Sequence, residues 1–265
     1  MCRWIAYSGA EIFIDHIVTA PGHSLIEQAH SADKAKTKVN GDGFGMAWYG
    51  AKPTPALYRD NLPAWADPNL ISIARHVKSP LFFAHVRAST SGSLSRDNCH
   101  PFVHDHWAFM HNGQIGDYPV VRRTLEAGLS HAAYAARIGN TDSELIFKLA
   151  IDRGLEIDPV GAFARALATV EEAALLVGVK PLIRFTSAFT DGKRLFAVRY
   201  ASDRFAPSLF WTRVPASHGI CVASEPFDDE SQAWTAVPSG HCLTIINGDV
   251  TMVPFAPAGP VRKTA

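Results

Sequence analysis

The sequence predicts an α+β fold in which helices cover antiparallel sheets. Its second half carries two hairpin signals, Asp191-Gly192 and Asn247-Gly248, each flanked by apolar and β-branched runs. Its first half mixes capped helical segments with apolar, strand-like segments and irregular loops. Strands that close a chain of mixed elements are typical of the α+β class.

Six segments of the first half have a defined local pattern. Ser24, with Glu27 three residues on, forms a capping box that begins a helix over 25–32. Asp67-Pro68 supplies an N-cap and a first helical residue for a helix that ends near residue 77. The other four segments are apolar and predict strands over 3–8, 44–49, 81–86 and 107–111.

Two further helices precede the strands of the second half. Thr141 and Glu144 form a capping box for a helix that ends near Gly154. Asp158-Pro159 begins the next helix, and Gly178 fits its end. Apolar residues along that helix recur at steps of three and four and predict one buried stripe: Phe163, Leu167, Val170, Ala174 and Val177. Strands are expected over 184–190, 194–200, 209–213, 220–223, 243–246 and 250–253.

Length and composition indicate a globular chain with no strongly charged partner. The chain has 265 residues, of which 47% are hydrophobic and 19% charged, a composition that excludes a mostly disordered protein. Twenty-five basic and 25 acidic residues give a formal net charge of 0, so neither nucleic acid nor an anionic membrane is an expected partner. We expect one domain over 1–253 and a proline-containing tail over 254–265.

The sequence carries no sign of export or membrane insertion. No uncharged apolar stretch approaches about 18 residues, and the N-terminus lacks the pattern of a secretory signal. We therefore expect a cytoplasmic protein. Its four cysteines are widely spaced, which in that compartment predicts free thiols: Cys2, Cys99, Cys221 and Cys242.

Cys2 stands where an N-terminal nucleophile would stand. Initiator methionine is normally removed before a small residue, and removal would give Cys2 a free α-amino group. A thiol would then share one residue with an amine whose pKa is about 7.7–8.0, near operating pH. The amine can take the thiol proton and return it to a leaving amine, as at an N-terminal threonine. The alternative is an arbitrary, frayed second residue.

Arg87 follows the apolar strand 81–86 and begins a polar, glycine-containing loop. Its planar guanidinium suits a carboxylate. The hydroxyls of Ser89, Thr90 and Ser91 could complete the carboxylate's hydrogen bonds. The alternative is an arginine in a structural ion pair.

Asn112-Gly113 and Asp142 are two further candidates. An asparagine NH2 and a glycine N–H that point the same way can form an oxyanion hole, whereas the ordinary alternative is an Asn-Gly turn. Asp142 lies in the first turn of the capped helix, where a carboxylate is stabilised. It could bind a substrate ammonium, and the alternative is a solvated acid.

Other motifs do not support a cofactor or a metal. The glycine-rich run at 40–45 is not a dinucleotide fingerprint, because Met46 stands where the last glycine should be and a strand follows. It predicts a tight loop that lets backbone approach another segment. The spacing of His100, His104, His106 and His111 matches no zinc motif, so neither a metal nor a cofactor is expected.

The order of these motifs resembles the class II glutamine amidotransferases, which are N-terminal-nucleophile glutaminases. Cys2 is followed by Asn-Gly-Asp-Gly-Phe-Gly, His-Val-Arg-Ala-Ser-Thr, Asn-Cys-His-Pro-Phe, His-Asn-Gly-Gln-Ile and Thr-Asp-Ser-Glu. The Met-Cys-Arg start and the stretch 222–229 are similar to stand-alone members that act on γ-glutamyl compounds. The resemblance spans about residues 2–246.

The resemblance implies a fold and a set of roles. The fold would be a four-layer αββα sandwich of the Ntn-hydrolase type, with two mainly antiparallel sheets between helical layers. Cys2 would attack the γ-amide of glutamine or a γ-glutamyl compound and form a γ-glutamyl thioester, releasing ammonia or an amine and then glutamate. The implied site residues are Cys2, with Asn112 and Gly113 as the oxyanion hole, Arg87 with Thr90 or Ser91 for the α-carboxylate, and Asp142 for the α-ammonium.

Two departures from the family leave alternatives open. Better-known members carry Trp and His where this sequence has Ala88 and Ser91, so contacts to the carboxylate are expected to differ. Many relatives fuse this domain to a synthase that uses the released ammonia. We therefore expect either a dedicated γ-glutamyl hydrolase or a glutaminase subunit that delivers ammonia to a separate synthase partner. A non-catalytic module and a homo-oligomer are further alternatives.

Overall fold

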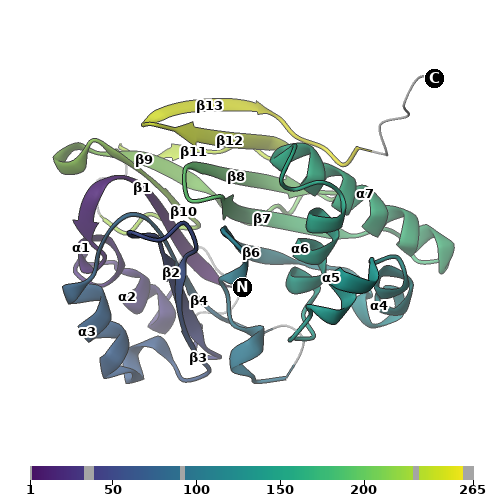
Figure 1. Ribbon diagram of the computed structural model, residues 1–265, viewed down its shortest axis with the longest axis horizontal. Helices are drawn as coiled ribbons and strands as arrows, with labels where there is room; N and C mark the ends of the chain where they lie inside the picture. The colour runs from purple at the N-terminus through teal and green to yellow at the C-terminus, as the bar shows by residue number, and fades with distance from the viewer. Residues whose placement is uncertain (1, 33–38, 90–92, 229–232, 259–265) are drawn as a thin grey trace.

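Two stacked sheets form the centre of the protein (Figure 1). The computed structural model describes residues 2–32, 39–89, 93–228 and 233–258. Sheet A has seven strands in the order β11-β9-β10-β1-β4-β2-β3, and sheet B has six in the order β13-β12-β8-β7-β6-β5. Their strands are β1 (Arg3–Phe13), β2 (Phe44–Trp48), β3 (Ala56–Asp60), β4 (Lys78–Val86), β5 (Phe102–His104), β6 (Trp107–Ile115), β7 (Ile183–Thr190), β8 (Arg194–Ala201), β9 (Phe210–Val214), β10 (Gly219–Ala223), β11 (Thr235–Ala236), β12 (His241–Ile246) and β13 (Asp249–Pro254).

Helices cover the outer face of each sheet. Buried side chains of the first three helices pack against sheet A, and those of the fourth, sixth and seventh pack against sheet B. All described strand pairings are antiparallel, so the predicted four-layer α+β fold is confirmed. The helices are α1 (Asp15–Val18), α2 (Leu25–His30), α3 (Pro68–His76), α4 (Tyr118–Ala127), α5 (His131–Ala135), α6 (Asp142–Asp152) and α7 (Pro159–Leu176).

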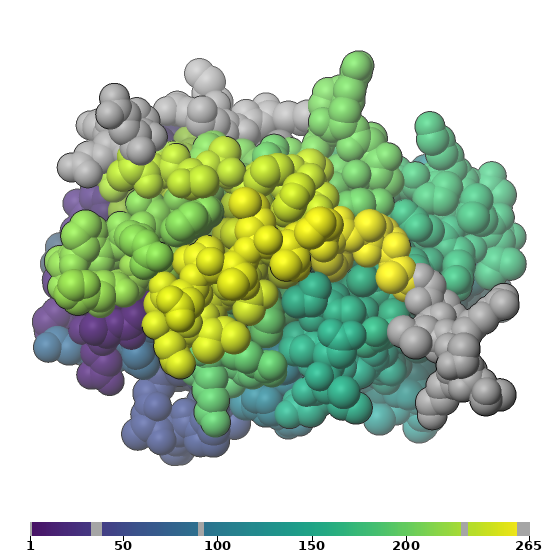
Figure 2. Space-filling model, turned by 90° about the horizontal axis from the view of Figure 1, so that it is seen from above, coloured from purple at the N-terminus to yellow at the C-terminus, as the bar shows by residue number. Residues whose placement is uncertain are grey.

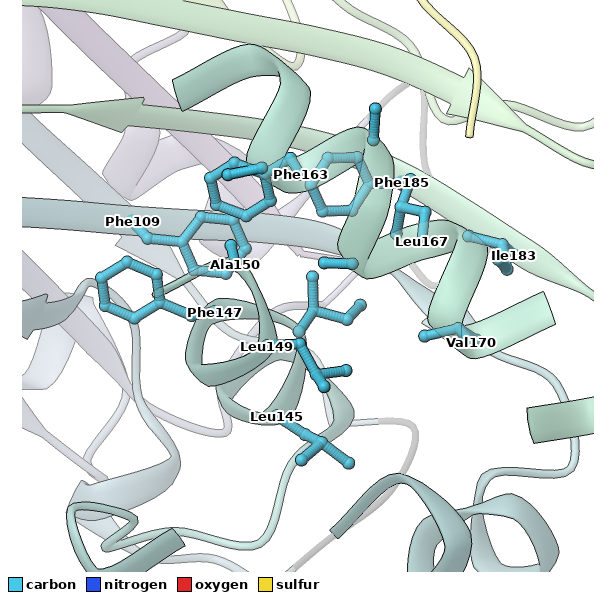
Figure 3. Close-up of a cluster of buried hydrophobic side chains, with 14 of the residues drawn as sticks. Phe109, Leu145, Phe147, Leu149, Ala150, Phe163, Leu167, Val170, Ile183 and Phe185 are labelled. Atoms are coloured by element: carbon cyan, nitrogen blue, oxygen red, sulfur yellow. The ribbon is translucent and has the colours of Figure 1, made fainter. Parts of the chain in front are cut away.

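Three hydrophobic clusters hold the four layers together. One lies between α4, α6, α7 and sheet B, where Phe109 stacks on Phe147 and Phe163 with ring centroids 5.2 and 5.1 Å apart (Figure 3). A second lies between sheet A and its helices. The third fills the space between the sheets and includes Trp4 and Met110. The inner faces of both sheets are therefore largely buried.

The expected helix starts are confirmed, but both predicted capping boxes are only half formed. The Ser24 N–H donates to the Pro21 carbonyl oxygen and not to Glu27. Ser24, Asp67, Thr141 and Asp158 each accept a backbone N–H in the first turn of their helix. The capping box at Thr141 is only half formed, because the Glu144 carboxylate does not return to Thr141. It accepts instead from the N–H groups of Ile138 and Gly139, each at 2.9 Å. Glu144 thereby fixes the loop that enters α6.

The expected strands are present, and two of them extend by four residues or more beyond their predicted ends. β1 continues to Phe13, and β6 continues through Asn112 and Gly113 to Ile115. At the second hairpin Asn247 and Gly248 have φ of +51° and +84°. Positive φ at both central residues matches the twist of the flanking strands.

The end of the described chain lies along sheet B. β13 is an edge strand whose residues are mostly exposed, and Figure 2 shows it in yellow across one face of the molecule. Phe255, just beyond it, is buried against the helical cluster of sheet B. No helix among the described residues is long and apolar enough to cross a membrane.

Candidate active site

Cys2 lies beside the residues that follow β4. β1 and β4 pair antiparallel with Arg3 opposite Val86, so the start of one strand meets the end of the other. Cys2 Sγ is 3.4 Å from the amide nitrogen of Ala88, which donates to it, and 3.5 Å from the Ala88 carbonyl oxygen, which accepts from the thiol. This pairing brings Cys2 next to Arg87.

Strand alternation indicates that three candidate side chains share the space between the sheets. Trp4 and Phe83 belong to the cluster between the sheets. Because side chains alternate along a strand, Cys2 and Arg87 continue the same inner face of sheet A. Asn112 alternates with Met110, which faces the same space from sheet B. Cys2, Arg87 and Asn112 therefore converge from opposite sheets.

Burial keeps the Cys2 thiol from ionising readily. Desolvation raises the pKa of Cys2, and the Ala88 N–H and the charges of Arg87 and Arg3 oppose that rise only in part. A thiol with a raised pKa is predominantly protonated at neutral pH, so it needs a base before it can act as a nucleophile.

Arg87 is held in a defined orientation by the glycine-rich loop. Its guanidinium is buried and donates to the Asp42 carbonyl oxygen at 3.3 Å and to Ser89 Oγ at 3.2 Å. Asp42 also accepts from the Ser89 N–H at 2.7 Å and donates its own N–H to the Arg87 carbonyl at 3.0 Å. The expected close approach of this loop is confirmed. Thr90 and Ser91 lie outside the described residues.

Asn112 and Gly113 form part of a strand, so the Asn-Gly turn alternative is wrong. They pair with Thr186 and Phe185 of β7. Asn112 is 1% exposed, and its Nδ2 has no hydrogen-bond partner among the described residues. A buried amide donor without a partner is rare in proteins. A Cβ at position 113 would clash with the Arg184 carbonyl oxygen, so the close contact between β6 and β7 requires glycine there.

Asp142 is a buried carboxylate, so the solvated-acid alternative is wrong. It is 7% exposed. Its two oxygens accept from the N–H groups of Ile115 and Ser143, each at 2.8 Å. These bonds fix the start of α6 against the end of β6, close to Asn112-Gly113.

His111 and Ser143 belong to this arrangement, although the sequence motifs suggested no role for them. His111 Nδ1 is 2.8 Å from Ser143 Oγ, and its Nε2 is 3.1 Å from the Arg184 carbonyl oxygen. Since a carbonyl can only accept, Nε2 carries the proton and Nδ1 accepts from the serine hydroxyl. Burial lowers the pKa of His111, which favours this neutral form. In the sequence, His111 directly precedes the candidate residue Asn112, and Ser143 directly follows the candidate residue Asp142. These positions were the one available indication of a role.

The clustered histidines of the sequence have separate surroundings. His100 is buried, and its ring lies tilted against the ring of His85, with centroids 4.3 Å apart. His104 lies near Asp105, and His106 lies near Glu156. Within the described part of the chain, no group of three His, Cys, Asp or Glu residues is arranged to hold a metal ion.

Comparison with known proteins identifies the family. Residues 18–212 match the family described as glutamine amidotransferases class-II. A probable glutamine amidotransferase of Saccharomyces cerevisiae, DUG3, is 34% identical over 96% of this chain and 84% of its own length. The chain belongs to the class II glutamine amidotransferases. It is therefore an enzyme of that family, as the order of its motifs predicted.

Other members of the class II family match over nearly the whole chain. The gamma-glutamyl-hercynylcysteine sulfoxide hydrolase of Mycolicibacterium smegmatis is 27% identical over 96% of this chain and 100% of its own. A solved class-II domain protein of Silicibacter pomeroyi superposes with a TM-score of 0.79 at 39% identity, over 97% of this chain and 100% of that one. The phosphoribosylpyrophosphate amidotransferase of Bacillus subtilis shares the fold, with a TM-score of 0.61 at 14% identity, over 96% of this chain and 49% of that one.

Proposed function

We propose that this class II enzyme cleaves the γ-amide of a γ-glutamyl compound, with Cys2 as nucleophile and its own α-amino group as base. The observation that carries the proposal is the convergence of Cys2, Arg87 and Asn112 on one space between the sheets. The raised pKa of the Cys2 thiol supports a mechanism in which a base must remove its proton.

The first half of the reaction is an acyl transfer. The α-amine takes the thiol proton, and the sulfur attacks the γ-carbonyl carbon. The Asn112 NH2 and the Gly113 N–H stabilise the oxyanion that forms. The carbon–nitrogen bond then breaks, and the leaving nitrogen takes the proton back from the Cys2 ammonium. Ammonia or an amine departs and a γ-glutamyl thioester remains.

Hydrolysis of the thioester completes the cycle. The α-amine takes a proton from water, whose oxygen attacks the thioester carbon. The carbon–sulfur bond breaks, glutamate leaves, and the proton returns to the Cys2 sulfur. The same base thus serves both halves.

Recognition of the substrate depends on the zwitterionic head of the glutamyl group. Arg87, buried and oriented by Asp42 and Ser89, is proposed to hold the α-carboxylate, with help from Thr90 or Ser91. Asp142 is proposed to hold the α-ammonium with the lone pairs that its two backbone bonds leave available. The name of one relative, gamma-glutamyl-hercynylcysteine sulfoxide hydrolase, supports the proposal of a γ-glutamyl substrate for this chain.

The test is glutamate release by protein whose mass confirms the loss of Met1. Glutamine and a panel of γ-glutamyl amides are assayed beside Cys2→Ala and, as a matched control, Cys242→Ala, which changes a buried cysteine of sheet B. We expect release that needs Cys2 and not Cys242, with a γ-glutamyl amide as the best substrate. Release that persists in Cys2→Ala would overturn the mechanism, and release that appears only with an added synthase would favour the ammonia-delivering subunit.

A further inference from the structure

Arg3 and Glu225 form a buried ion pair directly behind Cys2. Arg3 Nε lies 3.0 Å from Glu225 Oε2, and the exposed fractions of the two side chains are 0% and 2%. Arg3 Nη1 also donates to the carbonyl oxygen of Cys2 at 3.2 Å. The other carboxylate oxygen of Glu225 is 2.9 Å from His23 Nε2. The guanidinium therefore links the backbone of Cys2 to a distant segment of the chain.

The residues around Glu225 hold the start of β1 at several points. The Trp4 N–H donates to Ser224 Oγ at 2.9 Å, and the Ser224 N–H donates to the Trp4 carbonyl oxygen at 3.0 Å. The next residue, Ile5, pairs with Ala223 of β10. The backbone from Cys2 to Ile5 is thus fixed by the segment Ala223–Glu225, part of a motif to which the proposed mechanism assigns no role.

The direction of Arg3 excludes direct contact with a substrate between the sheets. Ile5 and Tyr7, which share the face of Arg3 along β1, belong to the cluster under the helices of sheet A. Arg3 therefore points away from the space that Cys2 and Asn112 share. It can act on the reaction through the backbone of Cys2, which it contacts, or through the charge that it places near the thiol.

The ion pair is a costly way to fill this position. Burial lowers the pKa of Arg3. Neither its Nε, which lies within ion-pair distance of Glu225, nor its Nη2 makes a hydrogen bond among the described residues. Replacing a buried ion pair with apolar side chains of similar volume is often neutral or stabilising. An apolar pair could therefore occupy the same position in the fold, but it could not hold the Cys2 carbonyl.

We propose that the Arg3–Glu225 pair is a positioning device for the N-terminal nucleophile. The carbonyl and the α-amino group of Cys2 are attached to the same Cα. Holding the carbonyl restricts rotation of a residue that would otherwise be free at a chain terminus. The pair thereby aligns the α-amine with the thiol and with the space between the sheets. This inference rests on the proposed function of Cys2 as nucleophile and base.

The test removes the pair without leaving an unpaired buried charge. In Arg3→Met/Glu225→Leu we expect a Tm close to that of the wild type and a KM within about twofold. We expect kcat to fall about 100-fold, the loss that misplacement of a reacting group by about 1 Å produces. The control is Arg194→Met, which breaks an ion pair with Asp191 in the β7–β8 hairpin of sheet B. A double variant with wild-type kcat would overturn the proposal.

A second variant tests the geometry of Arg3 separately from its charge. It also keeps the proposal testable if the double variant does not fold. Arg3→Lys keeps the positive charge, but its single ammonium lacks the fork that bridges Glu225 and the Cys2 carbonyl. We expect kcat to fall about tenfold with KM unchanged. The proposal would be overturned if Arg3→Lys kept the wild-type kcat while the double variant failed to fold. The ion pair would then contribute to stability alone.

Alkylation of Cys2 by iodoacetamide tests the pair without any substrate. The α-amine and the thiol titrate as a coupled pair in the aligned state. We expect the pH midpoint of the alkylation rate to move by about half a unit in Arg3→Lys. If the wild type released no glutamate, the proposed function would fail, yet a midpoint shift would still support the positioning role. Identical midpoints would overturn it.

Discussion

The surroundings of Asn112 support a role in stabilising the oxyanion of the proposed reaction. Its Nδ2 is buried and has no partner among the described residues, whereas its neighbour His111 has partners for both ring nitrogens. Leaving a buried amide donor unmatched costs about 1–3 kcal/mol. An oxyanion formed during acyl transfer would supply the missing acceptor at the moment when stabilisation accelerates the reaction.

Substitution of Asn112 should therefore lower kcat and leave binding nearly unchanged. In Asn112→Ala we expect kcat to fall about 100- to 1000-fold, the usual loss for one oxyanion donor, with KM within about threefold. Steady-state kinetics with the best γ-glutamyl amide measures both. Asn69→Ala, an exposed substitution on α3, is a control for general disturbance. A rise in KM with unchanged kcat would assign Asn112 to ground-state binding.

At the scale of elements, Asn98 joins the segment after Arg87 to the loop that enters α6. Its Nδ2 donates to the Ser93 carbonyl and to Asn140 Oδ1, and its Oδ1 accepts from the Asn140 N–H, each at 2.9 Å. Arg87 Nη2 reaches the same Ser93 carbonyl at 3.5 Å. The separation between the proposed carboxylate and ammonium contacts is thus set partly by Asn98.

Loss of this bridge should weaken recognition of the zwitterionic head. In Asn98→Ala we expect KM for the γ-glutamyl substrate to rise about tenfold, equivalent to about 1.4 kcal/mol, while kcat changes by less than about threefold. Asn69→Ala, an exposed substitution on α3, is the matched control. The same kcat/KM can be measured with an analogue that lacks the α-ammonium. If Asn98→Ala lowered kcat/KM equally for both compounds, Asn98 would not set the separation between the carboxylate and ammonium contacts.

At the scale of the whole molecule, two buried imidazoles connect the sheets. His85 lies on the inner face of β4 in sheet A, and His100 lies two residues before β5 of sheet B. Their four ring nitrogens have no partner among the described residues. Burial lowers the pKa of His85 to about 3 and the pKa of His100 well below its usual range.

These histidines should make the protein sensitive to acid. The unfolded chain binds protons at both imidazoles below about pH 6.5, whereas the folded protein does not. These two histidines therefore do not lower the free energy of unfolding above about pH 6.5, and they lower it progressively as the pH falls toward 3. The free energy of unfolding should drop by about 1.4 kcal/mol per pH unit for each imidazole.

Denaturant unfolding at several pH values measures this slope. His85→Phe/His100→Leu should flatten it between about pH 6 and 4, whereas the exposed His76→Ala on α3 should not. If the double variant and the wild type had the same slope, the acid sensitivity would come from other groups.

The sequence by itself determined much of the local structure and pointed to Cys2 as the proposed nucleophile. Helix starts at Ser24, Asp67, Thr141 and Asp158 and the turn at Asn247-Gly248 depend on contacts within a few residues, so the pattern of neighbours was enough to predict them. The order of the motifs was likewise enough to predict the class II family.

Only the tertiary structure decided how those motifs meet. Asn112-Gly113 forms a strand and not the alternative turn, because that segment pairs with β7. Asp142 is buried and not solvated, and it accepts a hydrogen bond from the Ile115 N–H. Neither the His111–Ser143 contact nor the Arg3–Glu225 pair has a local signal. Such contacts join residues far apart in the chain, and strand register and the stacking of the two sheets bring them together.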